Sequence, residues 1–403
     1  MNLEYIVIIA ICILYEAFWY FVIRHVNKKF QWLITSKDES PVLSEDGLRK
    51  FIPIGYDSEL GWIRKPNTDG IEKSNDMESK WTINGIGART NPGFDDMHST
   101  ISCYGDSFTF CRQVNDNETW EHYLSELQNT NVKNFGVGNY GLDQTILRLK
   151  REYPKNKTEI VIIGIVPDTI SRILSSWKHY YEYGNTFAFK PRFVIKNEKL
   201  VLIKNIIDEE SKFRSYERFL PEIKKNDFFY KNKFRKEIIR FPYSIYLLRN
   251  LSRNLQIIFW VLAKELMKGS KSKKNEWNPM KVIMRVNLRW RVKLYHNIEA
   301  RTLFEKILDE YASYARQNNF MPVFCVLPQK DDVNFVRTNT SFYKEFLNSL
   351  HIEKLKIIDT TDKLMLEKDL DSLYSDNNEY GGHYSSSGNK RIAEIINEEL
   401  SRI

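Results

Sequence analysis

A serine closely follows a short apolar run in the first third of the chain. The run 101–104 predicts a buried strand, and Gly105-Asp-Ser-Phe-Thr109 comes after it. Open α/β sheets bind ligands at the carboxyl ends of their strands, so Ser107 stands where a nucleophile would be useful. We expect Ser107 at the start of the following helix, where its backbone N–H and the helix dipole would favour an oxyanion. Taken alone, a helix N-cap is the commoner role for such a serine.

A histidine near the C-terminus could act as the base for Ser107, which favours the nucleophile over the N-cap. A serine becomes nucleophilic near neutral pH when a base lies within hydrogen-bond distance. His383 lies in the segment 379–389, a loop of small residues in which an imidazole can approach another strand end. We therefore predict Ser107 as the nucleophile and His383 as its general base. The remaining histidines lie outside any such motif: His25, His98, His122, His179, His296 and His351.

Strands and helices alternate in the part of the chain that carries these residues. Such alternation predicts an α/β fold with a parallel sheet that is covered on both faces. The predicted strands are 101–104, 132–137, 160–166, 322–327 and 355–358. The predicted helices are 119–127, 142–151, 300–316 and 389–400.

The third and fourth strands are separated by roughly 150 residues, far more than a crossover helix needs, so we predict an insertion over 175–298. Residues 190–295 carry 27 Lys and Arg against 10 Asp and Glu, a net +17, whereas the rest of the chain is −9. This asymmetry argues against a nucleic-acid binder. Residues 190–295 either contact anionic lipid or polysaccharide, or form a solvated lid whose charges only maintain solubility. The apolar run 255–263 is too short to span a bilayer and predicts a buried or interfacial helix. Basic residues follow it: Lys264, Lys268, Lys271, Lys273 and Lys274.

The first 30 residues predict a single transmembrane anchor. Residues 5–23 contain one acidic group, Glu16, and at about 1.5 Å per residue they nearly span a ~30 Å hydrocarbon core. We expect Glu16 to find a helix partner or water. Arg24, Lys28 and Lys29 follow the span, and the positive-inside rule would place the body in the cytoplasm. Residues 31–98 predict a linker and an irregular segment rich in turn formers.

Several blocks in their order resemble the GDSL or SGNH hydrolases. The first is Gly105-Asp-Ser-Phe-Thr109, and the last is Gly382-His-Tyr-Ser-Ser-Ser-Gly-Asn389. The segment 134–144, Gly61-Trp62 and Lys65-Pro-Asn67 are similar to blocks of membrane-anchored bacterial members linked to surface-glycan modification. The resemblance implies a flavodoxin-like, three-layer α/β/α sandwich over 99–403. It also implies an oxyanion hole formed by the N–H groups of Ser107 and Asn139, and a domain on the exported side.

Two positions depart from the pattern of that family. Where it has Gly-x-Asn-Asp, this chain has Gly164-Ile-Val-Pro-Asp168, so Pro167 removes a side-chain donor and Asp168 remains. Such a loss can cost about 3 kcal/mol of transition-state stabilisation. The family's acid, three residues before the histidine, is replaced by Tyr380. Either Asp376 or Glu379 orients the imidazole, or a Ser–His dyad operates, or the site is impaired.

The sequence thus predicts a serine esterase or acyltransferase that acts on O-acyl groups, such as acetyl groups, of a carbohydrate. The alternative is a catalytically impaired glycan-binding or assembly subunit. No cofactor or metal is predicted, because the four cysteines show no paired spacing and are expected in the core. The motif Gly136-Val-Gly-Asn-Tyr-Gly141 fits a dinucleotide fingerprint, but it follows the second strand and lacks the acid expected about 20 residues later.

Overall fold

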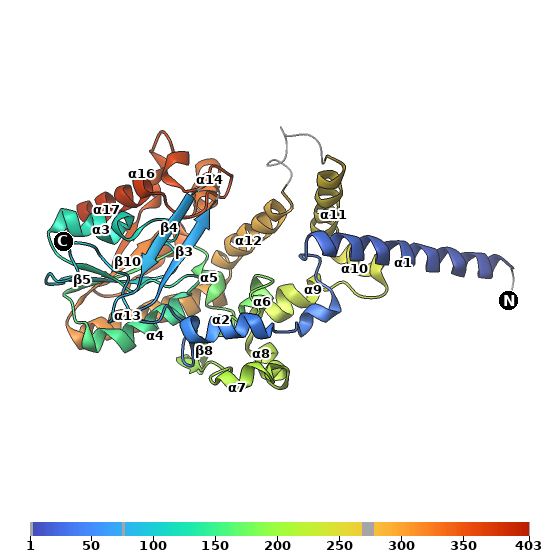
Figure 1. The fold of residues 1–403 in the computed structure, drawn as a ribbon, viewed down its shortest axis with the longest axis horizontal. Coiled ribbons are helices and arrows are strands. Elements are labelled where there is room, and N and C mark those ends of the chain that lie inside the picture. The colour runs from blue at the N-terminus through green and yellow to red at the C-terminus, as the bar shows by residue number, and fades with distance from the viewer. Residues whose placement is uncertain (1–2, 75–76, 268–277, 403) are drawn as a thin grey trace.

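A central sheet of five parallel strands organises the molecule. The computed structural model describes residues 3–74, 77–267 and 278–402 (Figure 1). The strand order is β11-β10-β7-β5-β6, which is the flavodoxin-like order 2-1-3-4-5. The five strands are β5 (Ile101–Gly105), β6 (Val132–Asn134), β7 (Ile160–Ile165), β10 (Met321–Val326) and β11 (Lys356–Asp359). All five lie within a residue or a few of the predicted runs, and the predicted parallel α/β class is confirmed.

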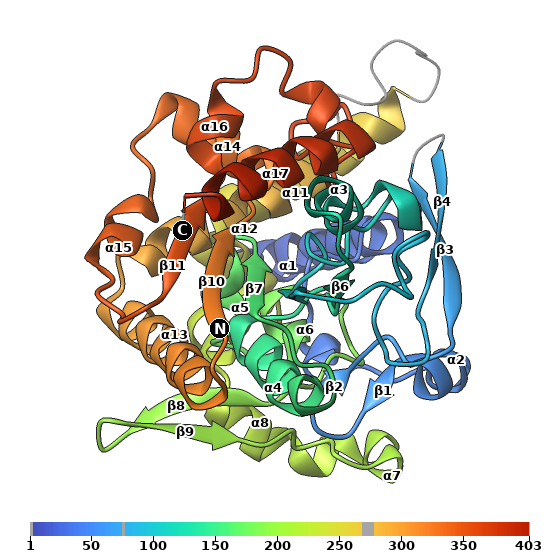
Figure 2. The ribbon, with the colours of Figure 1, turned by 90° about the vertical axis from the view of Figure 1, so that its left-hand side faces the viewer.

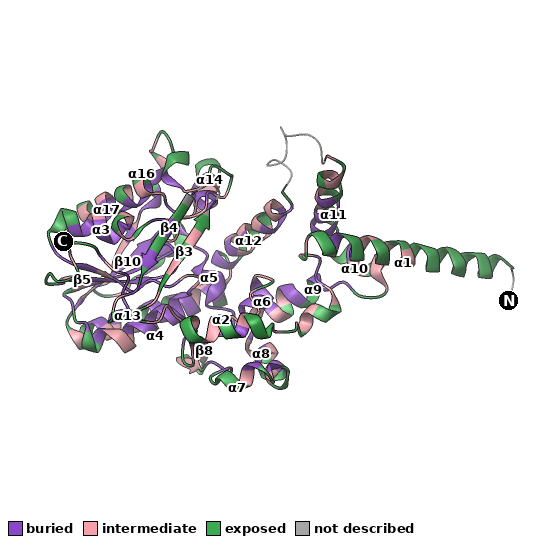
Figure 3. Ribbon diagram, viewed as in Figure 1, coloured by how far each residue is buried: buried purple, intermediate pink, exposed green. Residues whose placement is uncertain are grey.

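Helices cover both faces of this sheet (Figures 1 and 2). On one face α3 (Trp120–Gln128) packs against α17 (Ser386–Leu400), and the other face carries α4 (Leu142–Glu152) and α13 (Ile298–Asn318). Successive residues of a strand point to opposite faces, so Ile162 joins the core beneath α3 and α17, while Ile163 joins the core beneath α4 and α13. The three-layer sandwich follows from this alternation, and the sheet is its most deeply buried part (Figure 3).

The segment after β5 differs from the expectation for Ser107. Residues 106–113 form successive turns, and α3 begins only at Trp120 with Thr119 as its N-cap, whose side chain accepts from the His122 N–H. Ser107 is therefore not at a helix start, and it is not an N-cap. The predicted help from a helix dipole is wrong, because turns separate Ser107 from the start of α3.

Residues 31–98 are more regular than expected. They contain α2 (Glu45–Gly55) and two antiparallel strand pairs, β1 (Tyr56–Asp57) with β2 (Gly61–Trp62) and β3 (Asp69–Ser74) with β4 (Met77–Thr82). These strands are too short or too polar to produce an apolar alternation that the sequence could reveal. Trp62 is fixed to the sheet edge, since its Nε1 donates to the Gly138 carbonyl and its own carbonyl accepts from the Tyr140 hydroxyl.

A long excursion separates β7 from β10. It includes one strand pair and a series of helices before α13, and α14 to α16 follow β10. Its boundaries at 175–298 stay a prediction. The elements of the excursion that precede α13 are α5 (Thr169–Arg172), α6 (Lys178–Tyr181), β8 (Arg192–Lys196), β9 (Lys199–Ile203), α7 (Glu210–Phe213), α8 (Leu220–Asn226), α9 (Arg235–Glu237), α10 (Tyr243–Arg249), α11 (Leu251–Leu266) and α12 (Met280–Tyr295). The helices that follow β10 are α14 (Lys330–Thr338), α15 (Lys344–Ser349) and α16 (Thr361–Met365). Lys268, Lys271, Lys273 and Lys274 lie outside the described residues.

The N-terminal helix α1 (Leu3–Lys29) projects away from the sheet, with α10 and α11 beside its C-terminal half (Figure 1). It is long and apolar enough to cross a membrane, and most of its residues are exposed. Glu16 accepts hydrogen bonds from the backbone N–H groups of Tyr243 and Ser244, the first residues of α10. The acid within the apolar helix thus has a helix partner, as expected. Three of the four cysteines are buried, but Cys12 is exposed on α1, which corrects its assignment to the core.

Candidate active site

Ser107 and His383 line one cavity at the carboxyl edge of the sheet. Ser107 follows β5, and His383 lies in the loop that leads into α17. The cavity has a volume of about 1270 Å³, and Asn139 and Asp168 line it as well. Although both residues are described, no direct hydrogen bond joins Ser107 Oγ to His383 Nε2. Such bonds are often long in free enzymes and shorten when substrate binds.

Ser107 and Asn139, the two residues predicted to form an oxyanion hole, both line this cavity. The N–H groups of Ser107 and Asn139 have no hydrogen-bond acceptor in the described part of the chain. Asn139 has a φ of +67°, in the left-handed region that asparagine tolerates better than most residues. The neighbouring Gly138 has open space around it, since an added Cβ would meet nothing within 4 Å. Both donors are therefore available to a ligand oxygen.

The imidazole of His383 is oriented by Gln113. Its Nδ1 lies 2.9 Å from the Gln113 side-chain oxygen Oε1, which also accepts from the His383 backbone N–H at 2.8 Å. A backbone N–H can only donate, so this second bond identifies Oε1 as the acceptor end of the amide. Oε1 cannot donate to Nδ1, so Nδ1 carries the proton and the lone pair of Nε2 is available as a base.

Burial keeps this imidazole neutral. The His383 ring packs on the ring of Phe108, the residue after Ser107, with 4.8 Å between ring centroids. Burial lowers the pKa of His383 from 6.5 to about 3, and the positive charges of Arg112 and Arg172 act in the same direction. A neutral amide stands where a carboxylate would stabilise the imidazolium. The site therefore holds a correctly protonated but weak base.

The two acids predicted as partners of His383 lie elsewhere in the same cavity wall. Glu379 is 3.5 Å from Arg285 of α12. The Asp376 carboxylate lies beside Gly382, since an added Cβ there would be 2.7 Å from Asp376 Oδ2. Tyr380, at the position of the family's acid, donates its hydroxyl to the Lys281 carbonyl. Nδ1 of His383 bonds to Gln113.

Arg172 joins the segments that follow β5 and β7. Its Nη1 is 2.9 Å from Asp106 and also donates to the Tyr140 carbonyl, and its Nε is 3.2 Å from Asp168. The side chain is 9% exposed and faces the cavity. Although burial disfavours its charge, Asp106 and Asp168 raise the pKa of Arg172, so it stays cationic beside Ser107. Pro167 contributes only its carbonyl, which accepts from Tyr295.

Sequence reasoning did not find Gln113 and Arg172. Gln113 occupies a left-handed conformation with φ of +73°, in a loop whose carbonyls at Phe110, Cys111 and Val114 accept from the buried Arg89. No motif in the sequence marks such a position. An arginine four residues after Asp168, at helical spacing, was a weak signal for Arg172.

The excursion between β7 and β10 supplies one wall of the cavity. Arg291 of α12 forms ion pairs with Asp331 and Asp332 at the start of α14, and the Asp332 contact is 3.0 Å. Burial raises the pKa of both carboxyls, although the charge of Arg291 opposes this shift.

Across the described ranges, no group of three or more potential ligands could hold a metal ion. The glycine-rich segment after β6 forms the Asn139 side of the cavity.

These features define an α/β protein with a serine–histidine site at the edge of a flavodoxin-like sheet. No family model and no curated protein matches the sequence. A solved structure of a G-D-S-L family protein from Desulfitobacterium hafniense DCB-2, described as lipolytic, is 12% identical, with 74% of this chain and 98% of that chain covered and a TM-score of 0.31. A second solved structure is also 12% identical, covering 76% and 97%, with a TM-score of 0.36. Membership of that family stays a prediction.

Proposed function

We propose that the protein is a serine esterase or acyltransferase that acts on O-acyl groups of a carbohydrate. Ser107 Oγ attacks the ester carbonyl and gives its proton to Nε2 of His383. The oxyanion accepts hydrogen bonds from the N–H groups of Ser107 and Asn139. When the bond to the alcohol breaks, His383 returns the proton to the leaving alkoxide. Water or a sugar hydroxyl then attacks acyl-Ser107, with His383 again taking and returning a proton.

The observation that carries this proposal is the bonding of Gln113 Oε1 to both the backbone N–H and Nδ1 of His383. It leaves Nε2 unprotonated in the cavity that Ser107 shares. The carbohydrate class rests on the resemblance of the sequence blocks to glycan-modifying hydrolases. The open cavity of about 1270 Å³ is roomy enough for a sugar with its acyl group.

A fluorophosphonate probe tests the nucleophile, because it reacts with activated serines. We expect covalent labelling of the full chain at Ser107 and none in Ser107→Ala, with hydrolysis of a small acetyl ester lost in parallel. Release of acetate from an O-acetylated polysaccharide then tests the substrate class. Labelling of Ser107→Ala at the wild-type rate would show that another residue reacts.

A second candidate function has its own support. A neutral amide at Nδ1 provides no charge to stabilise the imidazolium, and Pro167 removes a donor, which together favour a glycan-binding or assembly subunit that has lost most activity. A folded protein that binds O-acetylated polysaccharide, but neither reacts with the probe nor releases acetate, would establish this alternative.

We also infer that α1 anchors the protein in a membrane with the α/β body on the exported side. The length and composition of α1 support the anchor, whereas the basic residues after it would favour the cytoplasm. A cysteine-accessibility assay decides the side. Cys103, Cys111 and Cys325 are buried, so a Cys12→Ala, Ser401→Cys protein has one exposed thiol, on the body. Labelling by a membrane-impermeant maleimide in intact cells supports export, and labelling only after lysis contradicts it.

A further inference from the structure

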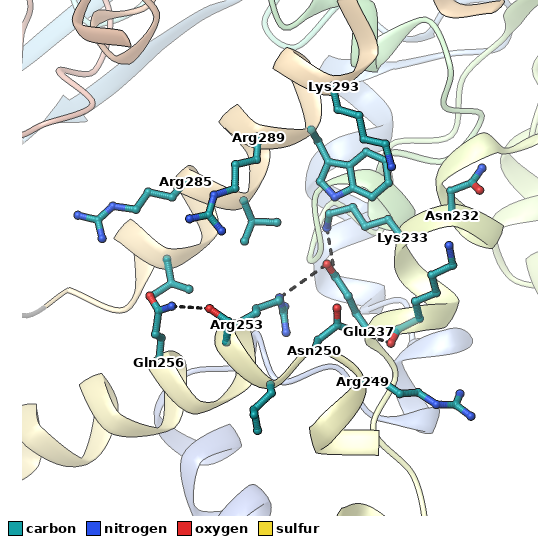
Figure 4. Close-up of a pocket in the computed structure, with 16 residues that line it drawn as sticks. Asn232, Lys233, Glu237, Arg249, Asn250, Arg253, Gln256, Arg285, Arg289 and Lys293 are labelled. Atoms are coloured by element: carbon teal, nitrogen blue, oxygen red, sulfur yellow. Dashed lines mark hydrogen bonds and ion pairs between the residues drawn. The ribbon is translucent and has the colours of Figure 1, made fainter. Parts of the chain in front are cut away.

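A second cavity, separate from the one at Ser107, lies among the helices next to α1. It has a volume of about 570 Å³ and opens between α9, the start of α11 and α12 (Figure 4). Among the described residues that line it, seven are basic and one, Glu237, is acidic. The basic residues are Lys233, Lys236, Arg249, Arg253, Arg285, Arg289 and Lys293.

Positive charge exceeds negative charge at the floor of this cavity, which we call the basic pocket. The side chains of Lys233 and Arg253 are only 3% and 7% exposed, and they share Glu237 at 3.2 Å and 3.7 Å. Arg253 Nε lacks a hydrogen-bond acceptor within the described residues. Two buried cations beside one carboxylate leave a net positive charge, whose desolvation is unfavourable unless an anion offsets it. Burial lowers the pKa of Lys233; the charge of Glu237 opposes this shift, and the charge of Arg253 adds to it.

The wall formed by α12 adds more positive charge. Arg285, Arg289 and Lys293 are four residues apart and so lie on one face of this helix (Figure 4). Like charges at this spacing destabilise an isolated helix. Arg285 is near Glu379 at 3.5 Å, but Arg289 has no recorded acid partner in the described ranges. The face therefore retains positive charge that a bound anion would neutralise.

The position of the pocket ties it to the membrane side of the molecule. Arg253 Nη2 donates to the carbonyl of Trp32 at 2.6 Å, three residues after the end of α1. Glu16 of α1 binds the start of α10, so α10 lies along the apolar helix. Several apolar side chains of α10 and α11 point outward: Ile245, Leu248, Leu251, Leu255, Leu262 and Leu266. Leu251 also lines the pocket.

We propose that the basic pocket binds the phosphate group of an anionic membrane lipid, whose acyl chains lie along the exposed apolar residues of α10 and α11. Arginine donors match phosphate oxygens in geometry and charge. A soluble phosphate ester would account for the cations but not for the adjoining apolar surface. This site does not include Ser107, so the lipid proposal does not depend on the proposed esterase activity.

The test uses the full chain in a neutral detergent at about 150 mM salt, where diffuse attraction is screened beyond roughly 8 Å. Thermal unfolding is measured with dioctanoyl phosphatidic acid, dioctanoyl glycerol, glycerol 3-phosphate and inorganic phosphate. We expect a concentration-dependent rise in Tm with phosphatidic acid alone, because a ligand that binds only the folded state stabilises it. Equal stabilisation by inorganic phosphate or by the uncharged lipid would overturn the assignment to a phospholipid.

Matched variants locate the binding. Arg249→Gln with Arg289→Gln removes two exposed charges of the pocket, whereas Lys196→Gln with Lys199→Gln removes two exposed charges of the β8–β9 pair. Both double variants are expected to keep the wild-type Tm without lipid. The first should weaken phosphatidic acid binding at least about tenfold, which corresponds to the loss of one good charge-assisted contact, and the second should leave it unchanged. Equal weakening by both pairs would show diffuse attraction and contradict the pocket.

Discussion

The side-chain oxygen of Gln113 lies 2.9 Å from Nδ1 of His383, the position at which a serine triad has its acid. The amide sets the tautomer as a carboxylate would, because Oε1 also accepts the His383 backbone N–H. It does not supply the negative charge that stabilises an imidazolium. Orientation and charge stabilisation, which one acid performs in a triad, are thus separated in this protein.

Ser107→Ala and His383→Ala should each abolish hydrolysis of a small acetyl ester without loss of fold. The double variant should be no worse than either single one, because the two side chains act as a unit. Initial rates and circular dichroism provide the measurement, and Ser401→Ala is the control for an exposed serine. Full activity of Ser107→Ala would refute its role.

Substitutions of Gln113 should separate orientation from charge. Gln113→Leu removes the acceptor and should lower kcat at least about tenfold, with little change in KM, because the orientation matters mostly in the transition state. Gln113→Glu keeps an acceptor, adds a charge next to Nδ1, and should raise kcat by about tenfold or more. Glu379→Gln is the matched control, since that side chain lies near Arg285. A stronger effect of Glu379→Gln or Asp376→Asn than of Gln113→Leu would restore an acid as the partner.

The value of kcat/KM should not fall on the acidic side of neutrality, because Nε2 of His383 stays unprotonated. Burial lowers the pKa of His383 to about 3, so the imidazole stays neutral as the pH falls through 6.5. We expect kcat/KM to be flat between about pH 8 and pH 5, where an unperturbed imidazole would lose about thirtyfold. The added charge of Gln113→Glu raises the pKa of His383 and should move the acid limb to higher pH. A wild-type limb near pH 6.5, with the fold intact, would contradict the buried neutral imidazole.

Two glycines of the segment 134–144, Gly136 and Gly138, should differ in their response to alanine. A Cβ on Gly136 would lie 2.3 Å from the Phe110 backbone nitrogen, so Gly136→Ala must displace the loop that carries Gln113. We expect a loss of about 1–3 kcal/mol in the free energy of unfolding. Gly138→Ala meets nothing within 4 Å and should stay within about 0.5 kcal/mol of the wild type. Denaturant unfolding of the full chain in detergent measures both, and equal losses would contradict the close approach at Gly136.

Arg172→Met should destabilise the protein more than removal of a surface arginine. It leaves Asp106 buried without its cation, which costs about 3–5 kcal/mol. Arg402 pairs with Glu399 at 2.7 Å but is 63% exposed, so Arg402→Met should cost no more than about 1 kcal/mol. The unfolding midpoints of the two variants measure these losses. Similar midpoints would show that buried Asp106 does not need the charge of Arg172.

Much of the fold was predictable because it is encoded in local patterns. Apolar runs and helical spacing located the five strands, the helices α3, α4, α13 and α17, and the apolar helix α1. The placement of Ser107 after a strand end followed from the apolar run before it. Period and propensity act over a few residues, so a single sequence displays them directly.

The partners of the site were decided only in the tertiary structure. Gln113 reaches His383 across 270 positions of the chain, through a left-handed loop that buried Arg89 holds in place. Arg172 joins Asp106 of one strand end to Asp168 of another, and the basic pocket collects cations from several separate helices. Such contacts depend on how loops turn and how helices pack, and no periodic pattern records that. The sequence pointed to Ser107 and His383, which the fold brings into one cavity. Long-range packing decided which group bonds to the imidazole and where the positive charges gather.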